Sequence, residues 1–319
     1  MKTNNLFRIA LLAVAVTFFA IACKKDNSAS SGSTSSTDVQ TAADDQSMLS
    51  TQNDALSDDA TASLNANASI SGASFDAEIK AGSVSLGGSI ALGSMCGATV
   101  TYDTANGNKI ITIVYNGDDC VGRFTRTGKV VITMAQGSHW KDQGAVVNIS
   151  VDTLTITRKR DGKSFVINGS KTITNTSGGL LADLATTDSI VHDFTANWTV
   201  TFPNGQSRTW TSTKHRVFTY SNGVVVTTTG SETGVNRFGV TFSLTITQPK
   251  VIAQSCDFSL TAGQDSITRS DNITSVITYG LDANGNVQTS CPLPSGYYYA
   301  KLVWTNGNNG KQYTYIFPY

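Results

Sequence analysis

The chain has 319 residues, with 23 basic and 23 acidic side chains and therefore no formal net charge. A nucleic-acid-binding protein usually carries a concentrated basic face, so this balance argues against a nucleic-acid partner. The densest basic cluster, RKRDGK at 158–163, is better explained as the charged end of a hairpin.

Residues 1–22 have the pattern of an export signal. Lys2 and Arg8 form a basic start, and the uncharged segment IALLAVAVTFFAIA follows at 9–22. This segment is shorter than the ~20 apolar residues of a membrane-spanning helix, so we interpret it as a signal peptide that is removed. Two interpretations of Cys23 follow: a secreted protein that begins with cysteine, or a lipoprotein whose Cys23 receives lipid.

The sequence before Cys23 resembles a bacterial lipoprotein signal, in which apolar residues and a small residue precede the cysteine. It departs from that signal at Ala20, where Leu, Val or Ile is more common. The resemblance implies lipidation of Cys23 with acyl chains such as palmitate, and several such chains hold a protein firmly in a membrane. We therefore expect a lipid-anchored envelope protein at the outer membrane, on its periplasmic or its outer face.

The cysteine count supports lipidation, because an exported protein with five cysteines has one left over after pairing. If Cys23 carries lipid, the other four can form two disulfides in an oxidising compartment. Of the three pairings we favour Cys96–Cys120 and Cys256–Cys291, because each pair brackets a hairpin-like segment. Metal binding by these cysteines is the weaker interpretation, since none has the spacing of a zinc site.

Residues 23–68 are predicted to form the lipidated cysteine and a tether. The segment 24–45 is dominated by Ser, Thr, Asp and Ala, and it has too little apolar surface to offset the entropy of ordering. In 46–65 four apolar residues could mark one side of a short helix, but the Ser, Thr, Asp and Asn between them are poor helix formers. A helix and a disordered chain are equally good predictions there.

Residues 69–319 are predicted to form an antiparallel β domain. Asn-Gly pairs recur between alternating segments, which is the strongest local signal of a hairpin. The clearest strand is FGVTFSLTIT at 238–247, with apolar side chains on one side only. Within 147–156 the apolar residues change from odd-numbered to even-numbered positions. One extra residue would keep both runs on the same face of the sheet, which predicts a β-bulge near Asp152 and Thr153. The segment 178–194 is predicted to be a crossover or a long loop.

These patterns predict an all-β fold, namely a large antiparallel meander after the signal peptide and the flexible tether. Short connections favour neighbouring strands in chain order. A curled sheet, a sandwich and an open barrel all agree with the alternation.

One segment carries a further resemblance. NGDDCVGRFTRTGKVVITM at 116–134 is similar to a stretch in hypothetical lipoproteins of Bacteroidetes-type bacteria, which also have a Ser/Thr/Asp tether and a Thr-rich β domain. Arg126, Gly128 and Lys129 match its Arg-x-Gly-Lys strand entry. The resemblance implies an exported, lipid-anchored β protein and says little about activity.

No pattern of a catalytic site, a metal site or a cofactor site is recognisable. The three histidines, His139, His192 and His215, are not in an HExxH motif, and there is no GxSxG, Walker or GxGxxG sequence. We expect no enzyme activity and no cofactor. The alternative is an envelope hydrolase that uses two Asp carboxylates, as some glycosidases do.

The C-terminal aromatic residues are the candidate binding residues. Tyr297, Tyr299, Trp304 and Tyr313 could stack on sugar rings or meet a protein partner. The interpretation that they cover a core and fix the C-terminus is favoured. We therefore expect a non-catalytic binding or structural role, with a glycan or an envelope protein as partner.

Overall fold

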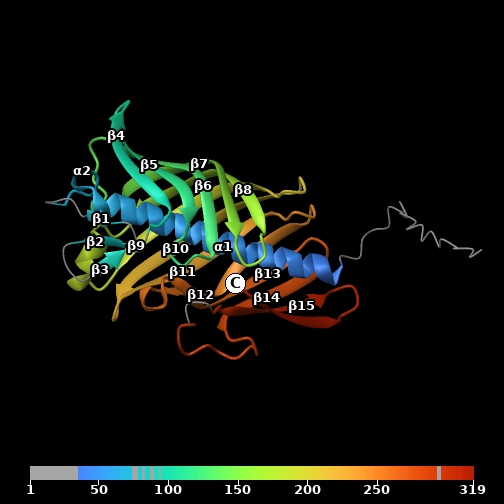
Figure 1. The fold of residues 1–319 in the computed structure, drawn as a ribbon. Helices are drawn as coiled ribbons and strands as arrows, with labels where there is room; N and C mark the ends of the chain where they lie inside the picture. Colours follow the sequence, from blue (N-terminus) through green and yellow to red (C-terminus); the bar gives the residue numbers. More distant parts are fainter. Residues whose placement is uncertain (1–34, 74–77, 81–82, 87–89, 93–94, 293–295) are drawn as a thin grey trace, which may run out of the picture. The chain divides into compact units, whose positions relative to one another are not determined.

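The main element of the computed structural model is a single antiparallel sheet of 13 strands (Figure 1). The structure describes residues 35–319 except 74–77, 81–82, 87–89, 93–94 and 293–295, and it describes no side chains between 74 and 94. The predicted signal peptide and Cys23 lie outside the described residues. The described residues belong to one compact unit.

The strands follow one another in chain order, and each is hydrogen-bonded to the next. They are β4 (Ala98–Ala105), β5 (Asn108–Asp118), β6 (Phe124–Ala135), β7 (Ala145–Arg158), β8 (Ser164–Asn175), β9 (Ile190–Thr201), β10 (Ser207–Tyr220), β11 (Val224–Val235), β12 (Thr241–Ala253), β13 (Ser259–Arg269), β14 (Ile273–Leu281), β15 (Tyr299–Asn306) and β16 (Gln312–Pro318). The sheet is not closed, because β4 and β16 are its two edges. The predicted all-β antiparallel meander is confirmed.

The turns show why neighbouring strands pair. Between β4 and β5, Asn106 and Gly107 both have positive φ angles, of 51° and 73°. Two consecutive positive φ angles produce the tight turn whose twist matches that of paired strands, and Asn-Gly adopts it at low cost. A second, three-stranded antiparallel sheet contains β1 (Glu78–Lys80), β2 (Ser83–Leu86) and β3 (Ile90–Leu92).

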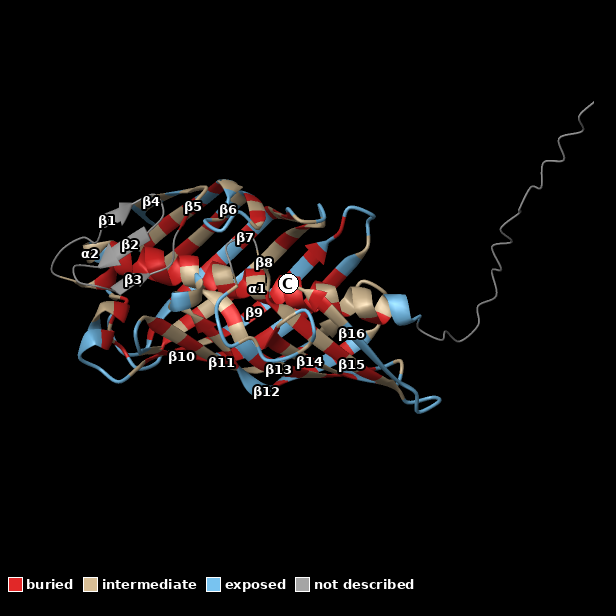
Figure 2. Ribbon diagram, turned by 60° about the horizontal axis from the view of Figure 1, so that its bottom comes forward, coloured by how far each residue is buried: buried red, intermediate tan, exposed pale blue. Residues whose placement is uncertain are grey.

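A long helix, α1 (Ser36–Ala66), lies against the inner face of the curled sheet (Figures 1 and 2). The Ser35 hydroxyl caps its start by accepting a hydrogen bond from the Asp38 N–H at 3.1 Å. The short helix α2 (Ala68–Ser71) follows. The prediction of a disordered tether is therefore wrong for residues 36–66, and the helix is longer than the 46–65 alternative.

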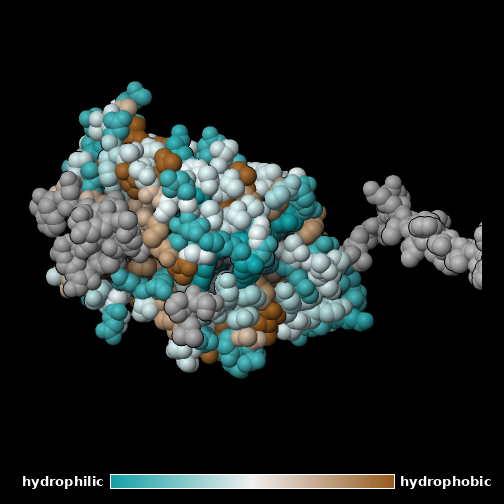
Figure 3. All heavy atoms as spheres, in the orientation of Figure 1, coloured by the Kyte–Doolittle hydropathy of each residue, from teal (hydrophilic) through white to brown (hydrophobic). Residues whose placement is uncertain are grey.

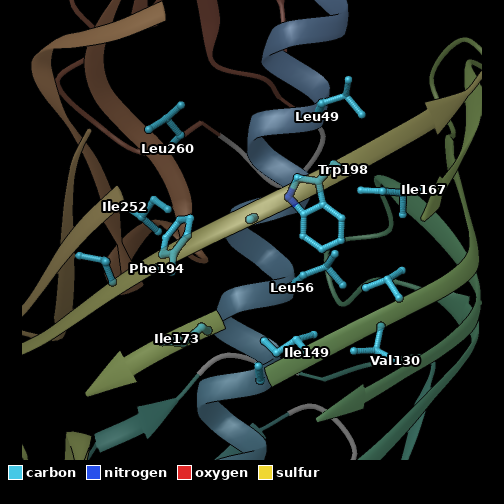
Figure 4. Close-up of a cluster of buried hydrophobic side chains, with 14 of the residues drawn as sticks. Leu49, Leu56, Val130, Ile149, Ile167, Ile173, Phe194, Trp198, Ile252 and Leu260 are labelled. Atoms are coloured by element: carbon cyan, nitrogen blue, oxygen red, sulfur yellow. The ribbon is translucent and has the colours of Figure 1, made fainter. Parts of the chain in front are cut away.

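The physical reason is that α1 is stabilised by its contacts with the sheet and not by the intrinsic helix propensity of its residues. Its Ser, Thr, Asp and Asn residues have low helix propensity, but most of the helix is buried, on nearly all sides. Figure 4 shows Leu49 and Leu56 among core side chains that come from both halves of the sheet. The labelled neighbours are Val130, Ile149, Ile167, Ile173, Phe194, Trp198, Ile252 and Leu260.

The predicted bulge in β7 is present. The pairing of β7 with β8 shifts register between Val151 and Leu154, and Thr153 has a φ of 54°. Opposite it in β8, Gly169 has a φ of 142°, and a Cβ there would lie 2.1 Å from the Asn197 carbonyl oxygen. The chain therefore needs glycine at this point, where β8 and β9 approach closely.

Two other predictions change in detail. The strand predicted at 238–247 begins at Thr241, because residues before it form a turn in which the Asn236 N–H donates to the Val240 carbonyl at 2.9 Å. The predicted loop at 178–194 contains the short 3₁₀ helix η1 (Leu181–Ala185) and the start of β9. A second 3₁₀ helix, η2 (Gln254–Cys256), follows β12.

The four cysteines of the β domain pair as predicted. Cys96 pairs with Cys120 across a sequence separation of 24, and Cys256 pairs with Cys291 across a separation of 35. Closing loops of this length removes entropy from the unfolded chain and stabilises a domain by ~3 kcal/mol per bridge. None of the helices in the described ranges is both long and apolar enough to cross a bilayer.

Candidate functional site

The inner face of the sheet is basic, and the helix that it encloses is acidic. Residues 36–66 contain six Asp and no Lys or Arg. The sheet directs basic side chains inward from β6, β7, β8, β10 and β12; they are Arg126, Arg158, Lys171, Arg208, Lys214, Arg216 and Lys250. Attraction between opposite charges therefore holds α1 against the sheet, in addition to the apolar contacts.

Asp44 forms the most extensive of these ion pairs. Its two carboxylate oxygens accept from the two terminal nitrogens of Arg158 at 2.7 and 2.8 Å, and Lys163 lies at 2.5 Å. Burial alone would raise the pKa of Asp44, but Arg158 and Lys163 lower it to about 2. Residues 158–163 do form a hairpin end, as predicted, although Arg158 points inward rather than into solvent.

Three further carboxylates of α1 also contact cations, although burial outweighs the cations at two of them: it raises the pKa of Asp58 to about 6 and raises that of Asp59. Asp59 contacts Arg126 at 2.9 Å, Asp58 contacts Arg216 at 2.8 Å, and Asp45 contacts Lys163 at 2.6 Å. Tyr115 also donates its hydroxyl to Asp59 at 2.8 Å. Because each of these four carboxylates faces a cation, this interior works as a structural network.

A groove on the outer face of the sheet is the candidate ligand site. It encloses about 750 Å³, part of it open to solvent, and it is lined by residues of β8 to β11 that include Thr172, Thr174, Asp193, Thr195, Thr213, His215 and Gly230. Strand alternation explains this composition: the neighbours of these residues point into the core, so hydroxyl and charged side chains face outward.

Gly230 forms part of one wall of the groove. It lies where the pairing of β11 with β12 shifts register, between Thr228 and Ser231, and its φ is 133°. A Cβ at this position would lie 2.2 Å from the Thr213 carbonyl oxygen. The backbone conformation and the close approach of β10 therefore both favour glycine at this position.

His215 and Asp193 form the polar centre of the groove. They are directly opposite in the β9–β10 register, and His215 Nδ1 lies 2.6 Å from Asp193 Oδ1. The other carboxylate oxygen of Asp193 accepts from the Thr176 hydroxyl at 2.9 Å. Both side chains are about half exposed, at 50% and 48%. The imidazole is thus held in a fixed orientation while it remains accessible.

The two residues are 22 positions apart and meet only across paired strands, so the amino-acid sequence alone does not reveal this pair. The only hint in the sequence was the alternation of apolar and polar residues along β9 and β10, which places His215 and Asp193 on the polar face. The other histidines are elsewhere: His192 packs between Trp140 and Phe218 in the core. Burial, reinforced by Arg216, lowers the pKa of His192 to about 3.

The predicted aromatic residues do not gather on one surface. Trp304 is buried and stacks on the partly exposed Tyr313, with ring centres 5.1 Å apart. Tyr297 lies within 5.5 Å of the guanidinium groups of Arg123 and Arg160, so it connects loops at different parts of the sheet. Tyr299 is half-buried at the start of β15.

The face in Figure 3 is mainly hydrophilic or neutral, with hydrophobic residues scattered over it rather than joined in one patch. In the described part of the chain, no group of three or more His, Cys, Asp or Glu side chains is placed to hold a metal ion. No protein-family model, no curated protein and no solved structure matches this chain.

Proposed function

We propose that this protein is a lipid-anchored component of the bacterial cell envelope that binds a hydroxyl-rich ligand, such as a glycan, without catalysis. The observation that carries the proposal is the groove over β8 to β11, in which rows of threonine hydroxyls surround the His215–Asp193 pair. Hydroxyl, imidazole and carboxylate groups can each donate to or accept from sugar hydroxyls.

An envelope hydrolase with Asp chemistry is the alternative, and it has less support. Such enzymes need two free carboxyl groups on either side of the scissile bond. Asp44, Asp45, Asp58 and Asp59 are instead paired with Arg or Lys beneath the sheet. In the groove, Asp193 is already bonded to His215.

The anchor part of the proposal gains a distance limit from α1. The helix is capped at Ser35, so only the eleven residues 24–34 separate Cys23 from the folded unit. A fully extended chain of that length reaches at most ~40 Å. The domain would therefore stay near the bilayer. Replacing Cys23 with Ala should move the protein from the membrane fraction to the soluble fraction; retention in the membrane would contradict lipidation at this residue.

The ligand part is tested with an array of glycans that includes fragments of peptidoglycan and of lipopolysaccharide. For any glycan that binds, we expect His215→Ala and Thr213→Val each to weaken binding by roughly two- to twelve-fold, because one lost hydrogen bond is worth ~0.5–1.5 kcal/mol. Thr101→Val is the matched control, since Thr101 is an exposed outward threonine on the distant edge strand β4. Equal affinity of all variants, or no binding glycan, would refute the groove as a glycan site.

A further inference from the structure

Lys250 and Asp265 form an ion pair that has no access to solvent. Lys250 is on β12 and Asp265 on β13, and their side chains are 1% and 0% exposed. Lys250 Nζ lies 2.8 Å from Asp265 Oδ2 and donates to the Ser50 hydroxyl of α1 at 3.0 Å. The hydroxyl of Tyr279, on β14, donates to the same Oδ2 at 3.0 Å.

One atom of this pair is left without a partner. Asp265 Oδ1 is buried and accepts no hydrogen bond from the described residues. Burying two charges costs several kcal/mol per ion, which the attraction between them repays only when the remaining hydrogen bonds are made. An unpartnered carboxylate oxygen is therefore a costly feature of the ionic form of this site.

We propose that the side chains of Lys250 and Asp265 become joined by an intramolecular amide bond, which crosslinks β12 to β13. The Nζ atom already contacts the carboxylate in a dry, rigid site, which replaces a bimolecular encounter by a positioned one. The amide product carries no charge, so the cost of burying the pair disappears.

The reaction needs no co-reactant. The ammonium of Lys250 first gives one proton to the carboxylate, which leaves an amine facing a carboxylic acid. Nζ then attacks Cγ of Asp265, the Cγ–Oδ1 bond breaks, and Oδ1 leaves as water with two protons that came from Nζ. Tyr279 continues to donate to Oδ2, which becomes the amide oxygen.

The proton transfer is the difficult step. Burial lowers the pKa of Lys250, but Asp265 and Glu232 outweigh it and raise the pKa above the ordinary value. Glu232, on the neighbouring strand β11, is thus a second carboxylate whose charge acts on the ammonium. We expect the bond to form slowly after folding, and to accumulate because the product is stable.

A second buried pair shows what distinguishes this site. Lys214 and Glu232 lie 2.9 Å apart and are 3% and 2% exposed. Both oxygens of Glu232 have partners, because Gln46 of α1 donates to Oε2 at 2.9 Å while Lys214 lies at Oε1. The carboxylate of Glu232 therefore has no unpartnered oxygen that would destabilise its ionic form, so we expect Lys214 and Glu232 to remain an ion pair.

Tryptic digestion of the purified, reduced protein tests the proposal directly. Trypsin cleaves after Lys and Arg, so an unmodified chain gives the separate peptides 238–250 and 251–269. The crosslinked chain gives a single peptide, 238–269, that is lighter than its sequence by one water molecule. Missed cleavage alone leaves the mass unchanged, and dehydration elsewhere in the peptide leaves Lys250 open to trypsin.

Two variants complete the test. Lys250→Arg keeps the cation but should give only the two separate peptides. Asp265→Asn should again give the single peptide, now lighter by one ammonia, because the amide nitrogen replaces the leaving oxygen. Recovery of the two separate peptides at full mass from the aged wild-type protein would overturn the proposal, and so would a loss of water that maps to Lys214 and Glu232.

Discussion

Replacing Asp44 with Asn should destabilise the protein by ~2.5 kcal/mol at neutral pH. The ion pairs with Arg158 and Lys163 lower the pKa of Asp44 from 3.8 to about 2, although burial opposes them. One pKa unit is worth about 1.4 kcal/mol, so this difference gives the quoted loss. The Asp44 side chain is only 20% exposed, so solvent screens the interaction little.

The loss should depend on pH in one direction. A carboxylate with a lowered native pKa stabilises the fold fully above its unfolded pKa, and this contribution disappears as the pH falls through the native pKa. The wild type and Asp44→Asn should therefore differ by the full amount above about pH 5 and by about half of it near pH 3. The difference should be small at pH 2, where about half of the native wild-type molecules carry a protonated Asp44.

The assay is urea unfolding followed by tryptophan fluorescence. All four tryptophans are buried, so unfolding changes their environment; they are Trp140, Trp198, Trp210 and Trp304. Asp188→Asn is the matched control, because Asp188 is exposed in the loop before β9. If both variants lose the same stability, or if the loss for Asp44→Asn is the same at pH 3 and pH 7, the ion pair does not stabilise α1 as argued.

Two other variants test the fold. Gly169→Ala should cost more stability than Gly107→Ala in the same urea assay, because a Cβ at Gly169 would lie 2.1 Å from a backbone oxygen and one at Gly107 meets nothing within 4 Å. Only the left-handed backbone cost of ~1–2 kcal/mol applies to Gly107, so equal losses would contradict the close approach of β8 and β9. His192→Phe should flatten the fall in stability between pH 6.5 and pH 4. In this pH range His192 binds a proton in the unfolded chain but not in the native protein, where its pKa is lowered to about 3. The free energy of unfolding therefore falls by up to ~1.4 kcal/mol for each unit by which the pH decreases. An unchanged slope would show that His192 is accessible to protons.

Much of the β domain was predictable because its signals are local. The Asn106-Gly107 turn, the alternation in β12 and the parity change at Thr153 each depend on a few adjacent residues. The disulfide pairs were also predictable, since each closes a segment of neighbouring strands. Whether the sheet is closed or open depends on the combined curvature of all its strands, so the sequence of a single strand does not indicate it.

The candidate site was less predictable. Threonines on the outer side of β8 to β10 follow from parity, but the groove also includes Gly230 at the shifted register of β11 and β12, and the His215–Asp193 contact needs the β9–β10 register. Similarly, Lys250 and Asp265 meet only through the pairing of β12 with β13.

The sequence by itself determined that this is an antiparallel β protein with short turns and two local disulfides, because period-two patterns and turn residues act over a few positions. Only the tertiary structure decided the state of residues 36–66. Taken without the rest of the protein, these residues are predicted to be a solvated, unfolded segment, because they include six Asp and many Ser and Thr. The curled sheet supplies Arg158, Arg126 and Arg216 as partners for those carboxylates, and a segment too polar to order itself becomes the buried helix at the centre of the fold.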